Sequence, residues 1–372
     1  MDYLKYWIPV LVLAAAFGGF FAGGDWVWLG IGSFPVLALL DTLTPNDYGT
    51  RRMSNATLAN LPIWLCAVGP VLLYVAFAWS LSHHPLNGWQ IFGGVLSLAW
   101  MSVIPLIPAA HELYHMRGII PRTVGRYSHL CILDCTRDIA HVVGHHIDVG
   151  TVDDGDTARR GANLYRFTWN AFLESTAYAM KMESGALRKK GLHPWNIRHR
   201  VYRALLAQLV FQCILFAVGG WKGTAFGLCA MLISRFWVES FNYFQHYGIV
   251  RVAGSPIGRR HLWNHLGWFS RTMAFEITNH ADHHLNSYQV YYKLKPHQEA
   301  IVMPSVFVCF LAALIPPLWH EGIIKPALKR WDTEFATAEE RALAAKQNAE
   351  AGWPDWQRQP GVQLGRASTV GV

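Results

Sequence analysis

Two long stretches near the middle of the chain carry no charged side chain, and they restrict the folds open to it. These are residues 61–81 and 89–110. An α-helix rises about 1.5 Å per residue, so roughly 20 apolar residues cross the ~30 Å hydrocarbon core of a bilayer. We therefore predict that both stretches are transmembrane helices joined by a short turn.

Two further stretches predict a second transmembrane hairpin. Residues 204–221 are uncharged, and residues 223–243 follow directly after Lys222, with Arg235 and Glu239 in their later half. Near the N-terminus, two more apolar runs complete a third pair, so that we expect six transmembrane helices in all.

The N-terminal pair spans about residues 4–21 and 26–40, separated by Gly23, Gly24 and Asp25. A cleaved signal peptide is the competing interpretation of the first run. Such a peptide starts with a strongly basic segment and ends at a small-residue cleavage site, and neither pattern is visible here. We therefore interpret the run as a membrane anchor.

Composition and the placement of cations support a membrane protein and predict its orientation. The chain is 52% hydrophobic and only 15% charged, below the roughly 25% charged residues of soluble domains. The turns at residues 23–25 and 82–88 contain no Lys or Arg, whereas Arg51, Arg52 and residues 111–203 supply many. Short loops rich in Lys and Arg stay in the cytoplasm, so the long connections and both termini should lie there. The formal charge of +8 reflects this bias, and we expect no nucleic-acid partner.

A last apolar run, residues 300–319, is uncharged but contains three prolines. Proline interrupts helices, and a crossing would place Lys325 and its basic neighbours outside the cell. We therefore predict a helix packed at the cytoplasmic side. Farther along, Thr337 and Glu340 form a capping-box pattern that predicts a helix through about Glu350.

These patterns predict an all-α integral membrane protein organised in four segments. Residues 1–110 would form four transmembrane helices, and residues 111–203 a cytoplasmic segment. Residues 204–245 would form the last transmembrane hairpin. Residues 246–372 would form a second cytoplasmic segment with C-terminal helices.

Eight histidines fall into three tight clusters within the two predicted cytoplasmic segments. Residues three or four apart share one face of a helix, so each cluster can direct several imidazoles to one point. A catalytic zinc uses three protein ligands, so eight neutral nitrogen donors exceed the needs of one ion and indicate two metal ions. The clusters consist of His111 and His115, then His141, His145 and His146, and finally His280, His283 and His284.

Nearby carboxylates are candidates for orienting these imidazoles through the second ring nitrogen. Seven acidic residues lie close enough in sequence to serve: Glu112, Asp148, Asp153, Asp154, Asp156, Glu276 and Asp282.

The sequence lacks a module for electron transfer. None of its six cysteines forms a CxxC pair, and no G-x-G-x-x-G follows a soluble strand, so we expect no iron–sulfur, flavin or nicotinamide site. Imidazole binds iron, copper, nickel and zinc, so the ligands alone leave the metal open. A redox-active pair of metal ions beneath apolar helices would be accessible to hydrocarbons dissolved in lipid. The electrons for such a pair would come from another polypeptide.

The boxes H-E-L-Y-H, H-V-V-G-H-H and N-H-A-D-H-H, with N-Y-F-Q-H-Y-G before the third, resemble those of the membrane-bound di-iron hydroxylases of alkanes and alkyl arenes. Further agreement favours the branch containing the hydroxylase components of xylene monooxygenase and its relatives acting on toluene or p-cymene. Ala140 precedes His141 where the alkane branch has glutamate, which also favours alkyl arenes. The agreement outside the boxes covers W-V-W-L-G (26–30), R-D-I-A-H (137–141), F-N-Y-F-Q-H-Y-G (241–248), E-I-T-N-H (276–280), I-P-P-L-W (315–319) and A-G-W-P (351–354).

The resemblance implies the chemistry and the remaining ligand. It supplies His246 as a ninth ligand, two iron ions as cofactors and O2 as co-substrate. It implies insertion of one oxygen atom into a methyl C–H bond of an apolar hydrocarbon, with electrons from a separate reductase of ferredoxin/flavin type or a rubredoxin. It further implies a bacterial inner-membrane protein, embedded in lipid, with the di-iron site on the cytoplasmic side.

Four alternatives remain open at this point. The chain could be a terminal hydroxylase of alkanes, or a fatty-acid desaturase with the same metal chemistry. H-E-L-Y-H also matches the HExxH pattern of a membrane zinc protease, with Glu112 as general base, although most of the histidines would then have no role. A metal transporter would need ionisable residues within the membrane helices, and the first four predicted helices have almost none.

Overall fold

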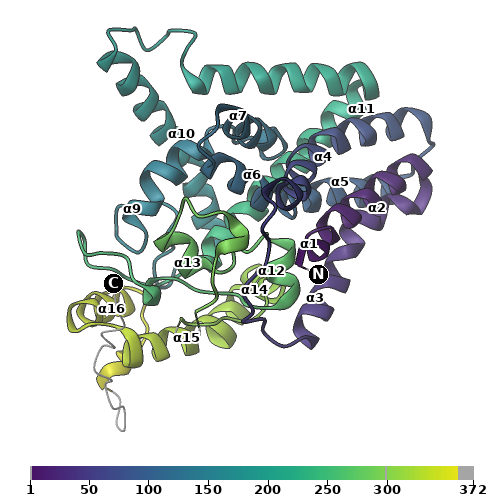
Figure 1. Ribbon diagram of the computed structural model, residues 1–372. Coiled ribbons are helices and arrows are strands. Elements are labelled where there is room, and N and C mark those ends of the chain that lie inside the picture. The colour runs from purple at the N-terminus through teal and green to yellow at the C-terminus, as the bar shows by residue number, and fades with distance from the viewer. Residues whose placement is uncertain (1, 298–299, 359–372) are drawn as a thin grey trace.

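The computed structural model of the protein describes residues 2–297 and 300–358 and is built from helices (Figure 1). Within these residues, extended pairing is limited to two isolated bridges, between Asn46 and Gly267 and between Asn264 and Val302. The expected all-α class is confirmed.

The helices divide into long ones and a set of short segments. The long helices are α2 (Ile8–Ala22), α3 (Leu29–Leu43), α4 (Ala56–His83), α5 (Gly88–Val103), α10 (Leu164–Lys189), α11 (Arg200–Gln245) and α16 (Ala338–Glu350). The short α-helices are α1 (Asp2–Lys5), α6 (Leu106–His115), α7 (Ile119–Ser128), α8 (Arg137–Ala140), α9 (His146–Asp148), α12 (Trp268–Met273), α13 (His280–Leu285), α14 (Val306–Ala313) and α15 (Lys325–Arg330). Single turns of 3₁₀ helix occupy Gly24–Trp28, His129–Ile132, Arg259–His261, Tyr291–Lys293 and Trp356–Arg358, and π-helical turns occupy His141–His145, Leu318–Ile324 and Trp331–Phe335.

Five helical stretches of the described chain are long and apolar enough to cross a membrane. They are Asp2–Ala22, Gly24–Leu43, Ala56–His83, Gly88–His115 and Arg200–Gln245. These five stretches agree with the membrane protein class that the composition predicts.

The longest stretch, α11, is a helical hairpin. Gly220 has φ 58° and ψ −156°, a conformation open to glycine, and it breaks the helix into two arms. The arms fold back on each other, so that the side-chain nitrogen of Gln212 lies 3.3 Å from the sulfur of Met231.

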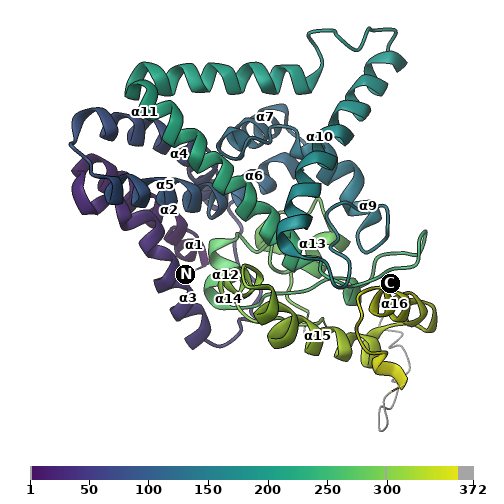
Figure 2. The same cartoon turned by 180° about the vertical axis from the view of Figure 1, so that it is seen from behind.

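The turns of three hairpins meet at one end of the bundle, at the right of Figure 1 and the left of Figure 2. The Nε2 atom of His84 lies 3.0 Å from the carbonyl oxygen of Phe21, and Gln90 donates to Asp25 over 3.0 Å. Ser82 donates to the carbonyl oxygen of Val218 in the third turn. The histidine-bearing helices α9 and α13 lie at the opposite end in both views.

Close backbone approach explains two of the glycines within the membrane helices. A Cβ atom on Gly94 of α5 would lie 2.2 Å from the ring of Phe77 in α4, and one on Gly30 of α3 would lie 2.6 Å from Ser97. Small residues at such contacts let apolar helices pack tightly where the hydrophobic effect offers little.

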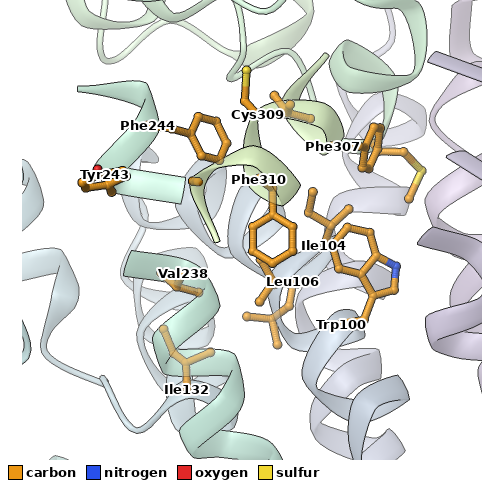
Figure 3. Packing of buried hydrophobic residues seen from close by; sticks show 14 of the residues in the cluster. Trp100, Ile104, Leu106, Ile132, Val238, Tyr243, Phe244, Phe307, Cys309 and Phe310 are labelled. Carbon is orange, nitrogen blue, oxygen red and sulfur yellow. The ribbon is translucent and has the colours of Figure 1, made fainter. Parts of the chain in front are cut away.

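The proline-containing run at residues 300–319 does not form a membrane-length helix. Its regular part, α14, has eight residues and therefore rises only about 12 Å. Phe310 on α14 packs against Phe34 and Phe241, with ring centroids 5.8 and 5.3 Å apart. Figure 3 shows Phe310 among core side chains that include Ile104 and Leu106. The run is therefore a short helix packed in the core, and its expected position at the cytoplasmic side stays a prediction.

The C-terminal helix begins as its sequence predicts. Thr337 accepts a hydrogen bond from the backbone of Glu340, whose carboxylate in turn accepts from the backbone of Thr337, and α16 ends at Glu350. The same carboxylate accepts from His261 over 2.7 Å and from Arg260, which fixes α16 against the loop before α12.

Two acidic side chains connect the membrane helices to the histidine-rich part. Asp41 at the end of α3 accepts hydrogen bonds from the backbone of Phe269 and Ser270, at the start of α12. Glu276 accepts from Tyr6 of the first membrane stretch and from Arg51. These contacts set the position of the third histidine box relative to the bundle.

Candidate metal centre

Five imidazoles converge in what we call the first cluster. One nitrogen atom from each lies within 4.8 Å of the others. The Nε2 atoms of His111 and His141 are 2.9 Å apart, and those of His141 and His146 are 3.2 Å apart. The members of the first cluster are His111, His115, His141, His146 and His283.

Three further imidazoles form the second cluster, which adjoins the first. The nitrogens of His145, His246 and His284 lie within 4.8 Å of one another. His280 extends this group, because its Nε2 atom is 3.1 Å from that of His246. The rings of His146 and His284 have centroids 4.5 Å apart, so the two clusters are in direct contact. All nine histidines singled out from the sequence therefore meet in one region.

The local helical backbone places the histidines of the first two boxes side by side. In α6 the α-helical spacing holds His111 and His115 on one face, as expected, and their ring centroids are 4.5 Å apart. The turn of the second box is π-helical, yet His141 and His145 share a face as the sequence pattern predicted, with stacked rings whose centroids are 5.0 Å apart. His141 belongs to the first cluster and His145 to the second, so this face lies where the two clusters adjoin.

Several of these buried ring nitrogens have no hydrogen-bond partner among the described residues. Both ring nitrogens of His115 and of His284 are in this state, as are Nε2 of His283 and Nδ1 of His246. Buried polar atoms are normally paired, so this group requires an explanation. Metal ions would satisfy the nitrogens that face the centre of the clusters.

Burial keeps these imidazoles in the form that binds metals. Desolvation lowers the pKa of His146 to about 2 and that of His280 to about 3, and it also lowers the pKa of His283 and His284. A neutral imidazole offers a free lone pair. The donor set of neutral nitrogens therefore fits iron.

One carboxylate directly orients a clustered imidazole. Asp154 accepts from Nδ1 of His145 over 2.9 Å, and Thr157 and the backbone of Asp156 hold it in place. Although burial opposes charge, this pair raises the pKa of His145 and lowers that of Asp154. Because Nδ1 is used, Nε2 of His145 is left for the cluster. His280 is oriented similarly, with Nδ1 3.3 Å from the carbonyl oxygen of Ile277.

The other predicted carboxylates have different surroundings. Glu112 accepts from the backbone of Tyr291, and Asp282 accepts from His297 and from the backbone of Lys295. Asp148, Asp153 and Asp156 line an acidic cavity of about 160 Å³ that has His145 and Asp154 in its wall. Burial raises the pKa of Asp156 to about 6.

Glu276 supports the third box through the backbone. It joins Arg51 and Arg271 in a buried ionic network and also accepts from Asn279, the residue at the start of α13, over 2.7 Å. Glu276 and Phe275 have φ of 62° and 44°, a left-handed conformation that costs free energy for residues other than glycine. The network holds this strained turn just before His280.

An apolar cavity of about 70 Å³ reaches both clusters and could not be located from the sequence. Its walls include His111 and His141 of the first cluster, together with His246 and His280. The apolar part of the lining is Val103, Ile104, Ile107, Pro108, Val238, Phe241, Ala274, Ile277 and Val306. These residues come from α5, the start of α6, α11, the loop before α13 and the first residue of α14, which converge only in the folded chain.

Two charged residues in the second arm of α11, Arg235 and Glu239, have buried partners. Glu239 accepts from Arg137 over 2.9 Å and pairs with Arg235, and both arginines also contact Asp134. Arg137 lines the apolar cavity. The charges that interrupt the predicted span are therefore paired beside the metal centre, away from lipid.

Comparison with known proteins agrees with this arrangement. A family model described as fatty acid desaturase matches residues 87–321. The chain is 40% identical to the xylene/toluene monooxygenase hydroxylase component XylM of Pseudomonas putida, over the full length of both. It is 28% identical to alkane 1-monooxygenase 1 of Pseudomonas aeruginosa, covering 83% of this chain and 80% of that one. It is also 26% identical to alkane 1-monooxygenase of Ectopseudomonas oleovorans, covering 82% and 77%.

Proposed function

Because the chain belongs to the family of membrane-bound alkane and xylene monooxygenases, we propose that it is the hydroxylase component of an alkyl-arene monooxygenase. It is an oxidoreductase that uses O2. The proposed reaction inserts one oxygen atom into a methyl C–H bond of a xylene-, toluene- or p-cymene-type substrate. The observation that carries this proposal is the pair of adjoining histidine clusters beside an apolar cavity.

The nine histidines would hold two iron ions, one at each cluster. His111, His115, His141 and His283 would serve the first cluster, and His145, His246, His280 and His284 the second, with His146 between them. Bound iron would supply the reduction of O2 that makes an inert C–H bond reactive. The protein contributes by orienting the imidazoles, through Asp154 at His145 and the carbonyl oxygen of Ile277 at His280.

The apolar cavity is the proposed substrate site. Its walls exclude water from the face of the clusters that includes His111 and His280, which protects the reaction from side products. An apolar cavity of about 150 Å³ can bind benzene, so a single-ring substrate would require side chains such as Phe241 to move outward here. The hydrophobic lining suits a hydrocarbon substrate.

The proposed topology places this site on the cytoplasmic side of the bacterial inner membrane. Counting the two arms of α11 separately gives six spans, and the cation-free turns at residues 23–25 and 82–88 would face the periplasm. The relative XylM is named as the hydroxylase component of its monooxygenase, which supports a separate component for electron transfer. Electrons would come from a separate reductase, of ferredoxin/flavin type or a rubredoxin.

Purification in detergent followed by metal analysis and product analysis tests the proposal. We expect about two irons per chain and reductase-dependent conversion of toluene, p-xylene or p-cymene to the corresponding alcohol. Parallel incubations with octane and with a lipid-bound acyl chain serve as controls for alkane hydroxylation and desaturation. Preferred turnover of octane or of the acyl chain would overturn the substrate assignment.

The zinc-protease alternative is disfavoured by the geometry. The carboxylate of Glu112, which would be the general base, already accepts a hydrogen bond from the backbone N–H of Tyr291. The histidines that a single zinc ion would leave unused all converge in the two clusters. A single zinc per chain in the metal analysis would revive this alternative.

A further inference from the structure

Basic residues gather in the connection between α10 and α11, residues 188–203, which we call the basic connection. No Asp or Glu occurs anywhere in residues 184–238. The cations of the basic connection are Arg188, Lys189, Lys190, Arg198, Arg200 and Arg203.

Most of this positive charge is uncompensated. Arg200 contacts Glu183 over 2.6 Å and Asp138 over 3.5 Å. Among the described residues, the other five cations of the basic connection have no carboxylate partner. An uncompensated cluster of cations attracts an anionic surface.

Two large apolar side chains project from the same segment. Trp195 is 76% exposed and Ile197 is 80% exposed. The ring of Trp195 stacks on Tyr202 at a centroid distance of 5.5 Å and an interplanar angle of 8°, and Tyr202 also stacks on His199. The first turn of α11 therefore holds Trp195 in an ordered, outward position. Tryptophan flanked by cations is typical of the boundary between lipid headgroups and acyl chains.

The position of the basic connection favours lipid as its partner. It runs directly into α11, and Arg200–Gln245 is one of the membrane-length stretches. Figures 1 and 2 show it at the far end of α10, away from α9 and α13. An electron-transfer protein must come near the histidines, and docking here would keep it distant.

We propose that the basic connection binds the headgroups of anionic lipids, with Trp195 and Ile197 inserted at the bilayer interface. The cations would pair with lipid phosphates, and the insertion would fix the cytoplasmic end of α11. Because Glu239 and Phe241 lie at the same end of this hairpin, bound lipid would stabilise the wall of the apolar cavity. The proposal stands independently of the substrate assignment.

Site-directed spin labelling tests the insertion. Labels at Trp195→Cys and Ile197→Cys, in a Cys213→Ser/Cys229→Ser background, are placed in nanodiscs with or without phosphatidylglycerol. We expect greater accessibility to O2 than to a water-soluble nickel complex when phosphatidylglycerol is present. A label at Lys346→Cys on α16 is the matched control and should remain accessible to nickel. Labels at both sites that are equally open to nickel in either lipid would overturn the proposal.

Charge neutralisation tests the headgroup binding. Arg188→Gln/Lys189→Gln/Lys190→Gln should weaken binding of phosphatidylglycerol by about tenfold or more, measured by native mass spectrometry of the detergent-released protein. The variant Lys293→Gln/Lys295→Gln/Lys346→Gln removes the same charge elsewhere and should bind as the parent does. Equal loss in both variants would contradict a specific site. Immobilisation of the 195 label only on addition of an acidic electron-transfer protein would show protein docking and also overturn the proposal.

Discussion

The two histidine clusters differ in what holds their imidazoles. In the first cluster, His111 and His115 lie on α6 at the end of a membrane-length helix, and both ring nitrogens of His115 lack a hydrogen-bond partner. In the second, His145 and His280 are oriented by Asp154 and by the carbonyl oxygen of Ile277. Packing of a rigid helix therefore positions His111 and His115 of the first cluster, whereas polar contacts from loops orient His145 and His280 of the second.

Loss of any clustered imidazole is the largest effect that this comparison predicts. His111→Ala, His283→Ala and His145→Ala should each abolish turnover, because a ligand of one proposed iron is removed. Metal analysis should show about one iron fewer per chain. His83→Ala, at the opposite end of the bundle, is the control and should retain iron and activity. Full activity in any of the three cluster variants would contradict the assignment.

Asp154→Asn should affect iron binding at the second cluster and not at the first. Removing the charge that orients His145 should weaken iron binding about 10- to 100-fold at the second cluster and leave the first unchanged. Titration of the metal-free protein with ferrous iron measures both sites. Asp153→Asn, at an exposed neighbour, is the matched control. Equal weakening at both clusters would show that they are not independently supported.

The apolar cavity, which touches both clusters, should discriminate substrates by size. Val238→Phe narrows the cavity. A hydrophobic pocket discriminates between substrates that differ by one methylene group by about 10- to 200-fold in kcat/KM. We expect kcat/KM to fall more for p-cymene than for toluene. Val238→Ile, a smaller change at the same position, should have an intermediate effect. A uniform loss for both substrates would place binding elsewhere.

Acidification should release the second iron before the first. Asp154 raises the pKa of His145, whereas burial lowers the pKa of His146 and His283. As pH falls from neutral toward about 5, protons therefore compete first for His145. In the metal-free protein, the raised pKa of His145 means that its protonation stabilises the folded state. This stabilisation is fully present below about pH 6.5 and is lost as pH rises through the pKa of His145 in the folded protein. Iron content after dialysis at successive pH values checks the order, and simultaneous release would contradict it.

Much of the architecture followed from local patterns. The apolar runs marked the membrane-length helices, and the pair Thr337 and Glu340 marked the start of α16. The prolines of residues 300–319 correctly indicated a short helix. These features depend on hydrophobicity, helix length and capping, which are properties of neighbouring residues.

Other features depended on contacts across the chain. Of the candidate carboxylates, Asp154 contacts a clustered imidazole, while Glu276 supports the third box through Asn279 and the ionic network. Sequence proximity cannot distinguish these roles, because the direction of a side chain depends on the packing around it. The π-helical turn at His141–His145 is a similar case, since its spacing differs from that of the α-helix assumed from the pattern.

The sequence by itself determined the all-α membrane class and eight of the nine histidines, because hydrophobic length and ligand type are properties of the residues, whereas His246 came from the family resemblance. Only the tertiary structure decided how those histidines divide into two clusters and which apolar side chains enclose the cavity beside them. Those arrangements bring together residues separated by more than a hundred positions, and their geometry is set by helix packing and buried hydrogen bonds.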